Sequence, residues 1–261
     1  MHDETSDSDK LAAAPATAED TVAPEAGPSR AAPPESRQRW RLVVGRAADA
    51  PSQTQRDLAE AWEAAIEGAG MPLARAGDAR SRPRISFGAP LPVGMAADGE
   101  LIDLVLTARW PAWRVREALT PVLPDGWRLV DLHDVWLAGP ALAGRVAAGE
   151  YRIVLGGAER VDTQRMVDAC MALLLSRRVP RTRRKGDSTV SYDLRPLLID
   201  ARMEDAGPPP VIVIQTRFHP ELGTGRPEEV VGAIADLIGE PLEVGTMVRL
   251  RVILADDLAR G

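Results

Sequence analysis

Residues 82–106 read RPRISFGAPLPVGMAADGELIDLVL, and this stretch constrains the fold more than any other part of the chain. Two prolines, Pro90 and Pro92, lie two residues apart between Gly88 and Gly94. Proline fixes its own φ angle and glycine permits turn angles that other residues avoid, so the backbone of this loop is largely preset. The stretch ends in an apolar run typical of a strand. We therefore expect a rigid apolar loop that leads into a strand of a sheet.

The sequence around this loop predicts the order β-α-β-β-α-β. Apolar residues occupy every second position at Trp40, Leu42 and Val44, and the residues between them would face the other side of a strand. This alternation is typical of a half-buried strand. Ser52 followed by Gln55 resembles a capping box at the start of a helix. The expected elements are a strand from 39, a helix after 52, extended pieces at 84–87 and 101–107, a helix from 111 and a strand at 127–137.

The same order begins again at Glu150. Asp162 is placed to cap a helix, and Pro227 occupies a first helical position with acidic residues after it. The expected elements are a strand at 151–155, a helix after 162, extended pieces near 188–198 and 211–218, a helix from 227 to 239 and a strand at 248–254.

We therefore predict an α+β protein made of two tandem ferredoxin-like units (β-α-β-β-α-β), each with an antiparallel sheet. Few large apolar residues occur near the start of the chain, so burial there cannot offset the entropy of ordering. The predicted parts are a disordered acidic Ala/Pro-rich tail at 1–38, a first unit at 39–137, a linker at 138–149, a second unit at 150–254 and a C-terminal tail at 255–261.

The charge of the chain is unevenly distributed. The formal net charge is −6, and residues 1–38 hold eight acids and three bases, a local −5, so the remainder carries about −1. The low pI is therefore no argument against an anionic partner for the rest of the chain. No run reaches the roughly 18–20 apolar residues that span a bilayer, and the acidic N-terminus is unlike a signal peptide. We expect a cytoplasmic protein with no membrane partner.

The single cysteine, Cys170, limits the chemistry of the chain. It lies among apolar residues on one side of a predicted helix, so we interpret it as a buried, inert thiol. An iron–sulfur cluster of the radical-SAM type needs several thiolates, which this chain cannot supply. No Cys/His cluster, HExxH motif or P-loop occurs, and we expect no cofactor and no metal.

The most concentrated charge is basic and covers residues 177–185, where six of nine residues are Arg or Lys. Arg177 and Arg178 are explained by the dipole at a helix C-terminus. The others lie beyond that helix, in an expected exposed strand or hairpin. They fit three interpretations: contact with RNA phosphates, contact with a protein partner or the acidic tail, and a solvated strand. The nucleic-acid-binding candidates are Arg84, Arg181, Arg183, Arg184 and Lys185.

Other residues give weaker patterns. His133 shares a strand face with Asp131 and is the only candidate for a catalytic general base, although a surface pair is the simpler interpretation. Trp40 and Trp62 are predicted core residues. Arg249 and Arg251 are expected to face away from the apolar side of the last strand. Residues 223–225 (GTG) are expected to form a plain turn.

Several segments, taken in order, resemble a known bacterial family, the radical-SAM-linked domain of unknown function. The resemblance implies partnership with a radical-SAM protein, and work on RNA or ribosomes. This chain would be a diverged, stand-alone member. The segments are RISFG at 84–88, LPVG at 91–94, ELIDL at 100–104, LPDG at 123–126, EYR at 150–152, KG at 185–186, DLRP at 193–196 and RPEE at 226–229.

These observations support three hypotheses. The first is a non-catalytic RNA-binding or substrate-presenting module that works with a separate radical-SAM enzyme. The second is an enzyme that cleaves or modifies RNA on a duplicated ferredoxin-like scaffold, with His133 as the base. The third is a protein-interaction scaffold with neither activity. The sequence favours the non-catalytic hypothesis and indicates no oligomeric state.

Overall fold

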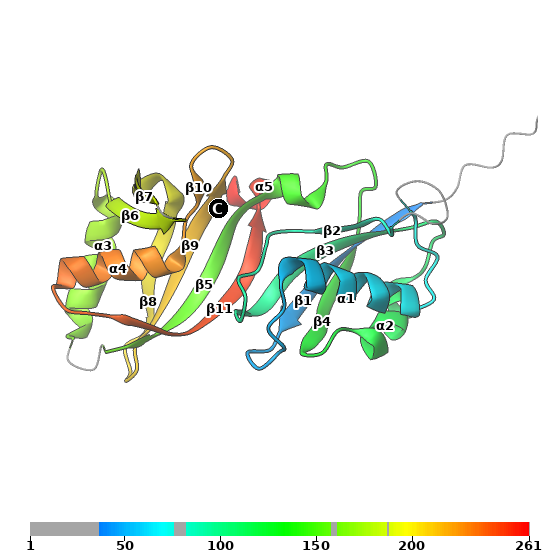
Figure 1. Cartoon of the computed structure of the whole chain (residues 1–261), viewed down its shortest axis with the longest axis horizontal. Helices are drawn as coiled ribbons and strands as arrows, with labels where there is room; N and C mark the ends of the chain where they lie inside the picture. Colours follow the sequence, from blue (N-terminus) through cyan, green and yellow to red (C-terminus); the bar gives the residue numbers. More distant parts are fainter. Residues whose placement is uncertain (1–36, 76–81, 158–160, 187, 261) are drawn as a thin grey trace, which may run out of the picture. The chain divides into compact units, whose positions relative to one another are not determined.

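The computed structural model describes residues 37–75, 82–157, 161–186 and 188–260, in which strands alternate with helices (Figure 1). The expected tail at 1–38 falls almost wholly outside the described residues. The elements are β1 (Gln38–Arg46), α1 (Gln55–Gly68), β2 (Ile85–Phe87), β3 (Ala96–Leu106), α2 (Ala112–Leu119), η1 (Thr120–Val122), β4 (Trp127–Val135), η2 (Leu142–Arg145), β5 (Val146–Gly156), α3 (Thr163–Leu175), β6 (Pro180–Lys185), β7 (Ser188–Asp193), η3 (Arg195–Leu197), β8 (Leu198–Asp205), β9 (Val211–His219), β10 (Gly223–Thr224), α4 (Pro227–Ile238), β11 (Glu243–Leu254) and α5 (Ala255–Leu258).

A nine-stranded sheet runs through the described residues in the order β10-β9-β5-β11-β3-β1-β4, with β2 also paired to β3 and β8 to β9. The pairings are antiparallel except that of β11 with β3, which is parallel. The fold is therefore α+β, as predicted, but the strands form one large, mostly antiparallel sheet where a separate sheet was expected for each unit. Within each half the strands lie in the order fourth, first, third, second: β4-β1-β3-β2 and β11-β5-β9-β8. The assignment to two ferredoxin-like units, and the boundaries given for them, stay predictions, because both halves share this one sheet.

The two halves join where β11 lies beside β3. Val248 pairs with Ala96 and Arg249 with Ala97, while β2 occupies the same edge of β3 farther along, at 102–104. One edge of β3 is thus shared by a strand of its own half and by the last strand of the chain.

Helices pack on the sheet in both halves and bury two apolar clusters. In the first half, α1 and α2 supply Trp62 and Leu119, which pack with Trp40 of β1. The Trp62 ring also meets Trp127 edge-on, with ring centres 5.5 Å apart. In the second half, α3 and α4 cover β5, β8 and β9. The predicted core positions of Trp40 and Trp62 and the buried state of Cys170 are confirmed.

The helix termini follow the sequence with one exception. Asp162 caps α3, accepting a hydrogen bond from the Gln164 N–H, and Pro227 is the first residue of α4. The predicted capping box at Ser52 and Gln55 is wrong. Thr54 caps α1 instead, and its hydroxyl accepts from the backbone N–H of Asp57. None of the helices in the described residues is long and apolar enough to cross a membrane.

The rigid loop identified in the sequence is held through its backbone carbonyls. The Arg249 guanidinium donates to the carbonyls of Pro90 (3.1 Å) and Ala89 (3.3 Å). Gln55 of α1 donates to the Leu91 carbonyl (2.6 Å), and Arg46 of β1 donates to that of Met95 (2.8 Å). The loop therefore joins β11, α1 and β1 through hydrogen bonds.

The expectation that Arg249 faces away from the apolar side is wrong. Its side chain is 1% exposed and pairs with Glu100 of β3 across the junction of the two halves. The register of β11 against β5 shifts between Arg249 and Arg251, which breaks the simple alternation of faces. Arg251 is exposed, as expected. Burial lowers the pKa of Arg249, but its hydrogen bonds and charge pairing with Glu100 raise it overall, which keeps the guanidinium charged.

Candidate functional site

The basic residues 180–185 form strand β6, which pairs with β7 in a two-stranded sheet separate from the main one. Asp193 fixes the base of this hairpin, since its carboxylate accepts from the N–H groups of Val179 (2.8 Å) and Arg195 (3.0 Å). Burial raises the pKa of Asp193, but these N–H groups lower it below its usual value. The expected exposed strand or hairpin is thus a hairpin. Its role in binding nucleic acid stays a prediction. The extended piece expected near 188–198 to accompany 211–218 is wrong, because 188–193 pairs with β6 and β8 (Leu198–Asp205) pairs with β9 instead.

The arginines of the hairpin have different surroundings. Arg181 is largely covered and forms ion pairs with Glu229 (3.6 Å) and Asp236 of α4. The guanidinium carbon of Arg183 lies 5.1 Å from the centre of the Tyr192 ring, within cation–π range. Arg184 is exposed and forms no ion pair within the described residues.

Tyr192 of β7 lies within a group of cations. Burial and the charge of Glu229 raise the pKa of its hydroxyl, and the charges of Arg183, Arg181 and Arg226 oppose that shift. The hydroxyl oxygen is buried and has no hydrogen-bond partner in the described part of the chain. One face of the hairpin therefore offers an aromatic ring with a guanidinium on it, and Arg184, which has no ion-pair partner among the described residues, lies on the opposite face.

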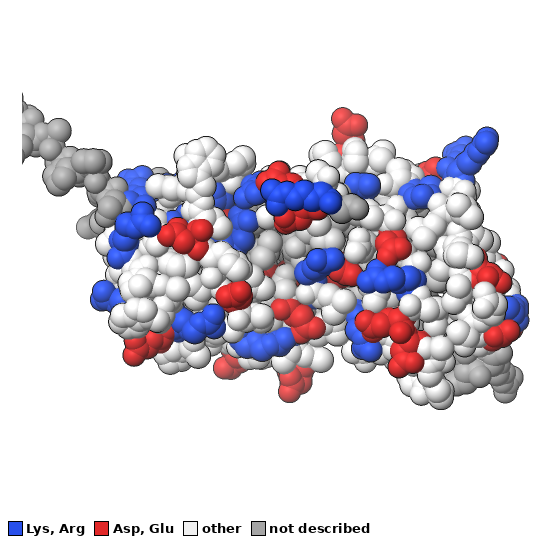
Figure 2. All heavy atoms as spheres, turned by 180° about the vertical axis from the view of Figure 1, so that it is seen from behind, with Lys and Arg blue, Asp and Glu red and all other residues white. Residues whose placement is uncertain are grey.

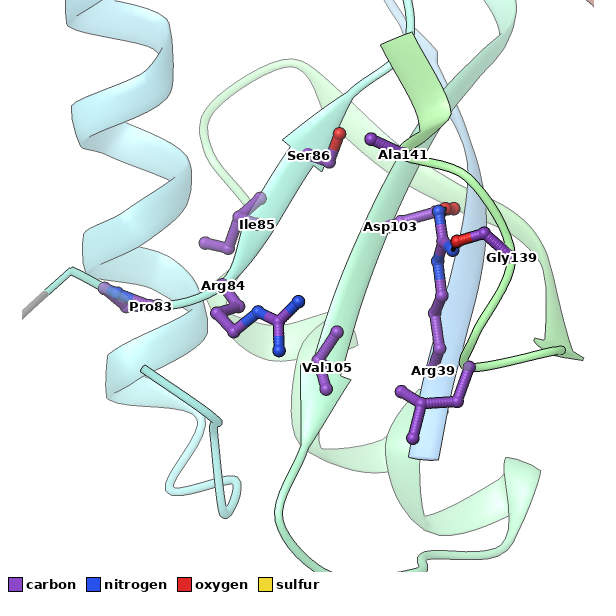
Figure 3. Close-up of a pocket in the computed structure, with 10 residues that line it drawn as sticks. Arg39, Pro83, Arg84, Ile85, Ser86, Asp103, Val105, Gly139 and Ala141 are labelled. Atoms are coloured by element: carbon purple, nitrogen blue, oxygen red, sulfur yellow. Dashed lines mark hydrogen bonds and ion pairs between the residues drawn. The ribbon is translucent and has the colours of Figure 1, made fainter. Parts of the chain in front are cut away.

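The remaining predicted contact residue, Arg84, belongs to a different site. It lines a pocket of about 330 Å³ bounded by β1, β2, β3 and the segment after β4. Figure 3 shows the Arg84 side chain extending from the start of β2 toward Val105. The backbone of Arg84 is fixed by hydrogen bonds to the Ala74 carbonyl (2.8 Å) and from the Val105 N–H (3.2 Å). The side chain is exposed and forms no ion pair among the described residues.

Two residues that line this pocket, Arg39 and Asp103, belong to a buried charged triad with Arg41 behind them. The carboxylate of Asp103, 2% exposed, accepts from Arg39 Nε (2.8 Å) and from Arg41 Nε (2.8 Å) and Nη2 (2.9 Å). Arg39 also donates to the carbonyls of Gly139 and Pro140, both at 3.0 Å. Two buried arginines therefore share one carboxylate, and the triad carries a net positive charge.

No hydrogen bond or ion pair within the described ranges joins Arg84 to the hairpin. The pocket is lined by residues between 39 and 141, whereas the hairpin covers 180–193. The structure thus places Arg181 and Arg183 on one face of β6, Arg184 on the other face of the same strand, and Arg84 elsewhere. Lys185 is the last residue of β6.

His133 lies on β4 opposite Arg41 of β1. Its Nε2 is 3.5 Å from Asp131 Oδ2, and Arg116 is 3.6 Å from the other oxygen of that carboxylate. All three side chains are about half exposed. No group of three or more potential metal ligands occurs within the described residues. A role for His133 as general base stays a prediction.

Charges of both signs are interspersed on the side of the molecule seen from behind (Figure 2). One paired group is Glu150 of β5, which accepts from Arg202 (3.0 Å) and Arg251 (2.5 Å). Burial raises the pKa of Glu150, but the hydrogen bonds from Arg202 and Arg251 lower it below its usual value. Many of the arginines are therefore neutralised locally, whereas Arg84, Arg183 and Arg184 are among those that form no ion pair with a carboxylate in the described part of the chain.

Two features in or near the pocket were missed in the sequence. Arg39 and Arg41 lie two residues apart on β1, and Asp103 lies on β3. Only the pairing of β1 with β3 shows that the three side chains meet. Trp136 was assigned to a strand, yet β4 ends at Val135 and the indole is 77% exposed in the turn that follows. The Gly139-Pro140 pair after it was the available turn signal.

The sequence model of one family, described as an uncharacterized protein conserved in bacteria (DUF2344), matches residues 39–228. That description does not mention radical-SAM proteins, so this part of the resemblance stays a prediction. No curated protein matches the chain.

Two solved structures are similar to the chain at low identity. One is a chain of a Cbf5–Nop10–Gar1 complex, with 9% identity and a TM-score of 0.43, covering 81% of this chain and 49% of that one. The other is a chain of an H/ACA RNP bound to a substrate RNA containing 2′-deoxyuridine, with 11% identity, a TM-score of 0.43, and coverage of 81% and 47%. The chain spans about half the length of both.

Proposed function

Since this chain belongs to the DUF2344 family of uncharacterized bacterial proteins, whose description states no activity, we propose from the site itself that it is a non-catalytic RNA-binding module. The contact surface is the β6–β7 hairpin. The observation that supports this function is the Arg183 guanidinium on the Tyr192 ring, with Arg184, which has no ion-pair partner among the described residues, next along β6 on the other face of the hairpin.

This arrangement suits a single strand better than a duplex. Proteins that bind single strands combine cations that follow the phosphates with flat side chains on which bases stack. Arg183, held against Tyr192, presents such a flat cation, and the exposed Arg184 is available to a phosphate. Lys185 extends the basic run. The contact is thus expected to depend on salt more than on base sequence.

Arg181 has a supporting role in this proposal. Its ion pairs with Glu229 and Asp236 hold the hairpin against α4, so it has little remaining capacity for a phosphate. We therefore expect Arg181→Ala to loosen the hairpin and lower stability, with less effect on the salt dependence of RNA binding than the loss of Arg184.

The test is the affinity of a fluorescent single-stranded RNA, measured by anisotropy across a salt series. For single strands, log affinity falls with log salt by about 0.7 for each phosphate contacted. Arg183→Ala and Arg184→Ala should each weaken binding and make the slope shallower by about that amount. Arg165→Ala is the matched control, because it removes the same charge at a position away from the hairpin. Arg165 lies on α3 and pairs with Glu240 (3.2 Å). Equal effects of Arg184→Ala and Arg165→Ala would contradict the proposed contact.

The same RNA tests the enzymatic alternative. Cleavage or modification of the RNA by the purified chain, abolished by His133→Ala, would replace the non-catalytic proposal. Unchanged RNA after prolonged incubation is the expected result.

Partnership with a radical-SAM protein is the second part of the proposal, and it is supported by the family resemblance rather than by a contact. A single cysteine cannot hold the required cluster, so such chemistry would have to come from another chain. The test is co-purification from cells with and without nuclease. Retention of a radical-SAM protein after nuclease treatment is expected for a substrate-presenting module. Loss of all protein partners after nuclease treatment, with RNA retained in the untreated samples, would contradict the partnership with a radical-SAM protein. Retention of other proteins, without RNA or a radical-SAM protein, would favour an interaction scaffold.

A further inference from the structure

The pocket beside Arg84 has the charge of a site for a dianion. Arg39 and Arg41 carry two positive charges and Asp103 one negative charge, all three buried, and Arg84 adds one more at the opening. The local sum is therefore about +2. A phosphate monoester carries about −1.5 to −2 at pH 7, which matches this sum better than a carboxylate does.

The hydrogen-bond donors of the triad determine where a ligand can be held. Arg39 is fixed by Asp103, Gly139 and Pro140, so it acts as a rigid positive wall. The Arg84 guanidinium has no ion-pair partner among the described residues, and its fork of N–H groups can hold two phosphate oxygens at once. Ser86 also lines the pocket, opposite Asp103 in the strand register, and offers a hydroxyl. Figure 3 shows Arg84 and Arg39 on opposite sides of the same space.

The exposed indole of Trp136 is outside the lining of this pocket but lies next to Gly139, which is part of that lining. The Trp136 carbonyl accepts a hydrogen bond from the N–H of Gly139, which lines the pocket. A side-chain carbon placed on Gly139 would lie 3.6 Å from Trp136 Cε3 and 3.8 Å from Arg39 Nη1. The exposed indole and the positive wall are thus neighbours on the two sides of Gly139. A residue larger than glycine would fill the space between them.

We propose that this pocket binds a nucleoside monophosphate. The phosphate lies between Arg84 and the Arg39–Asp103–Arg41 triad, and the base stacks on Trp136. The pocket volume of about 330 Å³ is at the lower end of the range for small-molecule sites, which suits a mononucleotide. The site is separate from the hairpin and does not depend on RNA binding there.

Isothermal titration calorimetry of the full chain with AMP, adenosine and inorganic phosphate tests the proposal. AMP should bind at least tenfold more tightly than either adenosine or phosphate. Arg84→Gln should weaken AMP binding roughly tenfold or more, since a charge-assisted pair is lost, and leave adenosine unchanged. Trp136→Ala should weaken AMP binding about five- to tenfold and leave phosphate unchanged.

Matched variants control for the loss of a positive charge, the loss of an indole ring and the loss of folded structure. Arg82→Gln removes an arginine two residues earlier that lies beside Glu63 (3.8 Å), and Trp113→Ala removes an indole on α2 that is 66% exposed. Both should bind AMP as the unchanged protein does, and circular dichroism should show all four variants folded. Arg184→Ala should also leave AMP binding unchanged, which separates this site from the hairpin.

Three results would overturn the assignment: no heat of binding with AMP at millimolar concentration, equal affinities for AMP and phosphate, or equal effects of Arg84→Gln and Arg82→Gln.

Discussion

Replacing Glu100 by glutamine should destabilise the protein more than any change at an exposed ion pair. Glu100 is 5% exposed and Arg249 1%, and the pair links β3 to β11. Glutamine keeps the shape and one acceptor oxygen, but it leaves a buried guanidinium without a counter-charge. Arginine cannot release its proton inside a protein, so the charge persists. Breaking a buried pair in this way costs about 3–5 kcal/mol.

The comparison with a double variant separates charge from packing. Arg249→Met combined with Glu100→Leu removes both charges and replaces them with apolar volume, a change that is often neutral or stabilising at buried pairs. Here the double change also removes the hydrogen-bond donors to the Ala89 and Pro90 carbonyls. If water does not reach these two carbonyls, their loss lowers the free energy of unfolding by about 1 kcal/mol or more. The double variant should therefore lose stability, but less than Glu100→Gln alone.

The assay is urea unfolding followed by tryptophan fluorescence, with Glu60→Gln as the control. Glu60 pairs with Arg56 on α1 at 3.0 Å, and both side chains are exposed, so its loss should cost no more than about 0.5 kcal/mol. A loss below about 1 kcal/mol for Glu100→Gln, or a double variant less stable than the single one, would refute the reasoning.

Two further predictions concern titratable groups. The pKa of Glu150 is lowered in the folded protein, so its ion pairs contribute stability above the unfolded pKa of about 4.3, and this contribution is lost as pH falls through the folded pKa. Glu150→Gln should thus be less stable than the unchanged protein at pH 6–8, with the difference shrinking below about pH 4 in urea unfolding curves; a difference independent of pH would contradict this. Burial, with a further contribution from Asp200, raises the pKa of the Cys170 thiol to about 11, so a disulfide reagent at pH 8 should label the folded protein far more slowly than the protein in urea. Rapid labelling of the folded protein would show that the thiol is accessible.

Local patterns were enough to predict the elements and one candidate surface. The alternation of Trp40, Leu42 and Val44 identified β1, and the positions of Asp162 and Pro227 identified two helix starts, because each signal depends on neighbours in sequence. An exposed strand or hairpin at the basic run was predicted for the same reason, but its pairing with 188–193 and the existence of β8 were not.

Features that depend on distant pairing were not predictable. The shift of register near Arg249 is set by contacts with β5 and reverses the face that simple alternation assigns. The triad around Asp103 needs residues 62 and 64 positions apart in sequence to meet, and no local pattern encodes that. The different roles of Arg181 and Arg184 likewise depend on α4, which follows some 40 residues later.

The parallel pairing of β11 with β3 has a consequence for how the protein is made. Residue 254 ends β11, while β3 ends at residue 106, so 148 residues are synthesised between them. At about 5–20 residues per second, the ribosome takes roughly seven to thirty seconds over this interval. During that time Glu100 has no Arg249 to pair with, and part of the β3 edge has no neighbouring strand. A nascent chain interrupted before β11 would therefore keep an open strand edge in its otherwise complete N-terminal half, a surface of the kind that chaperones and proteases act on.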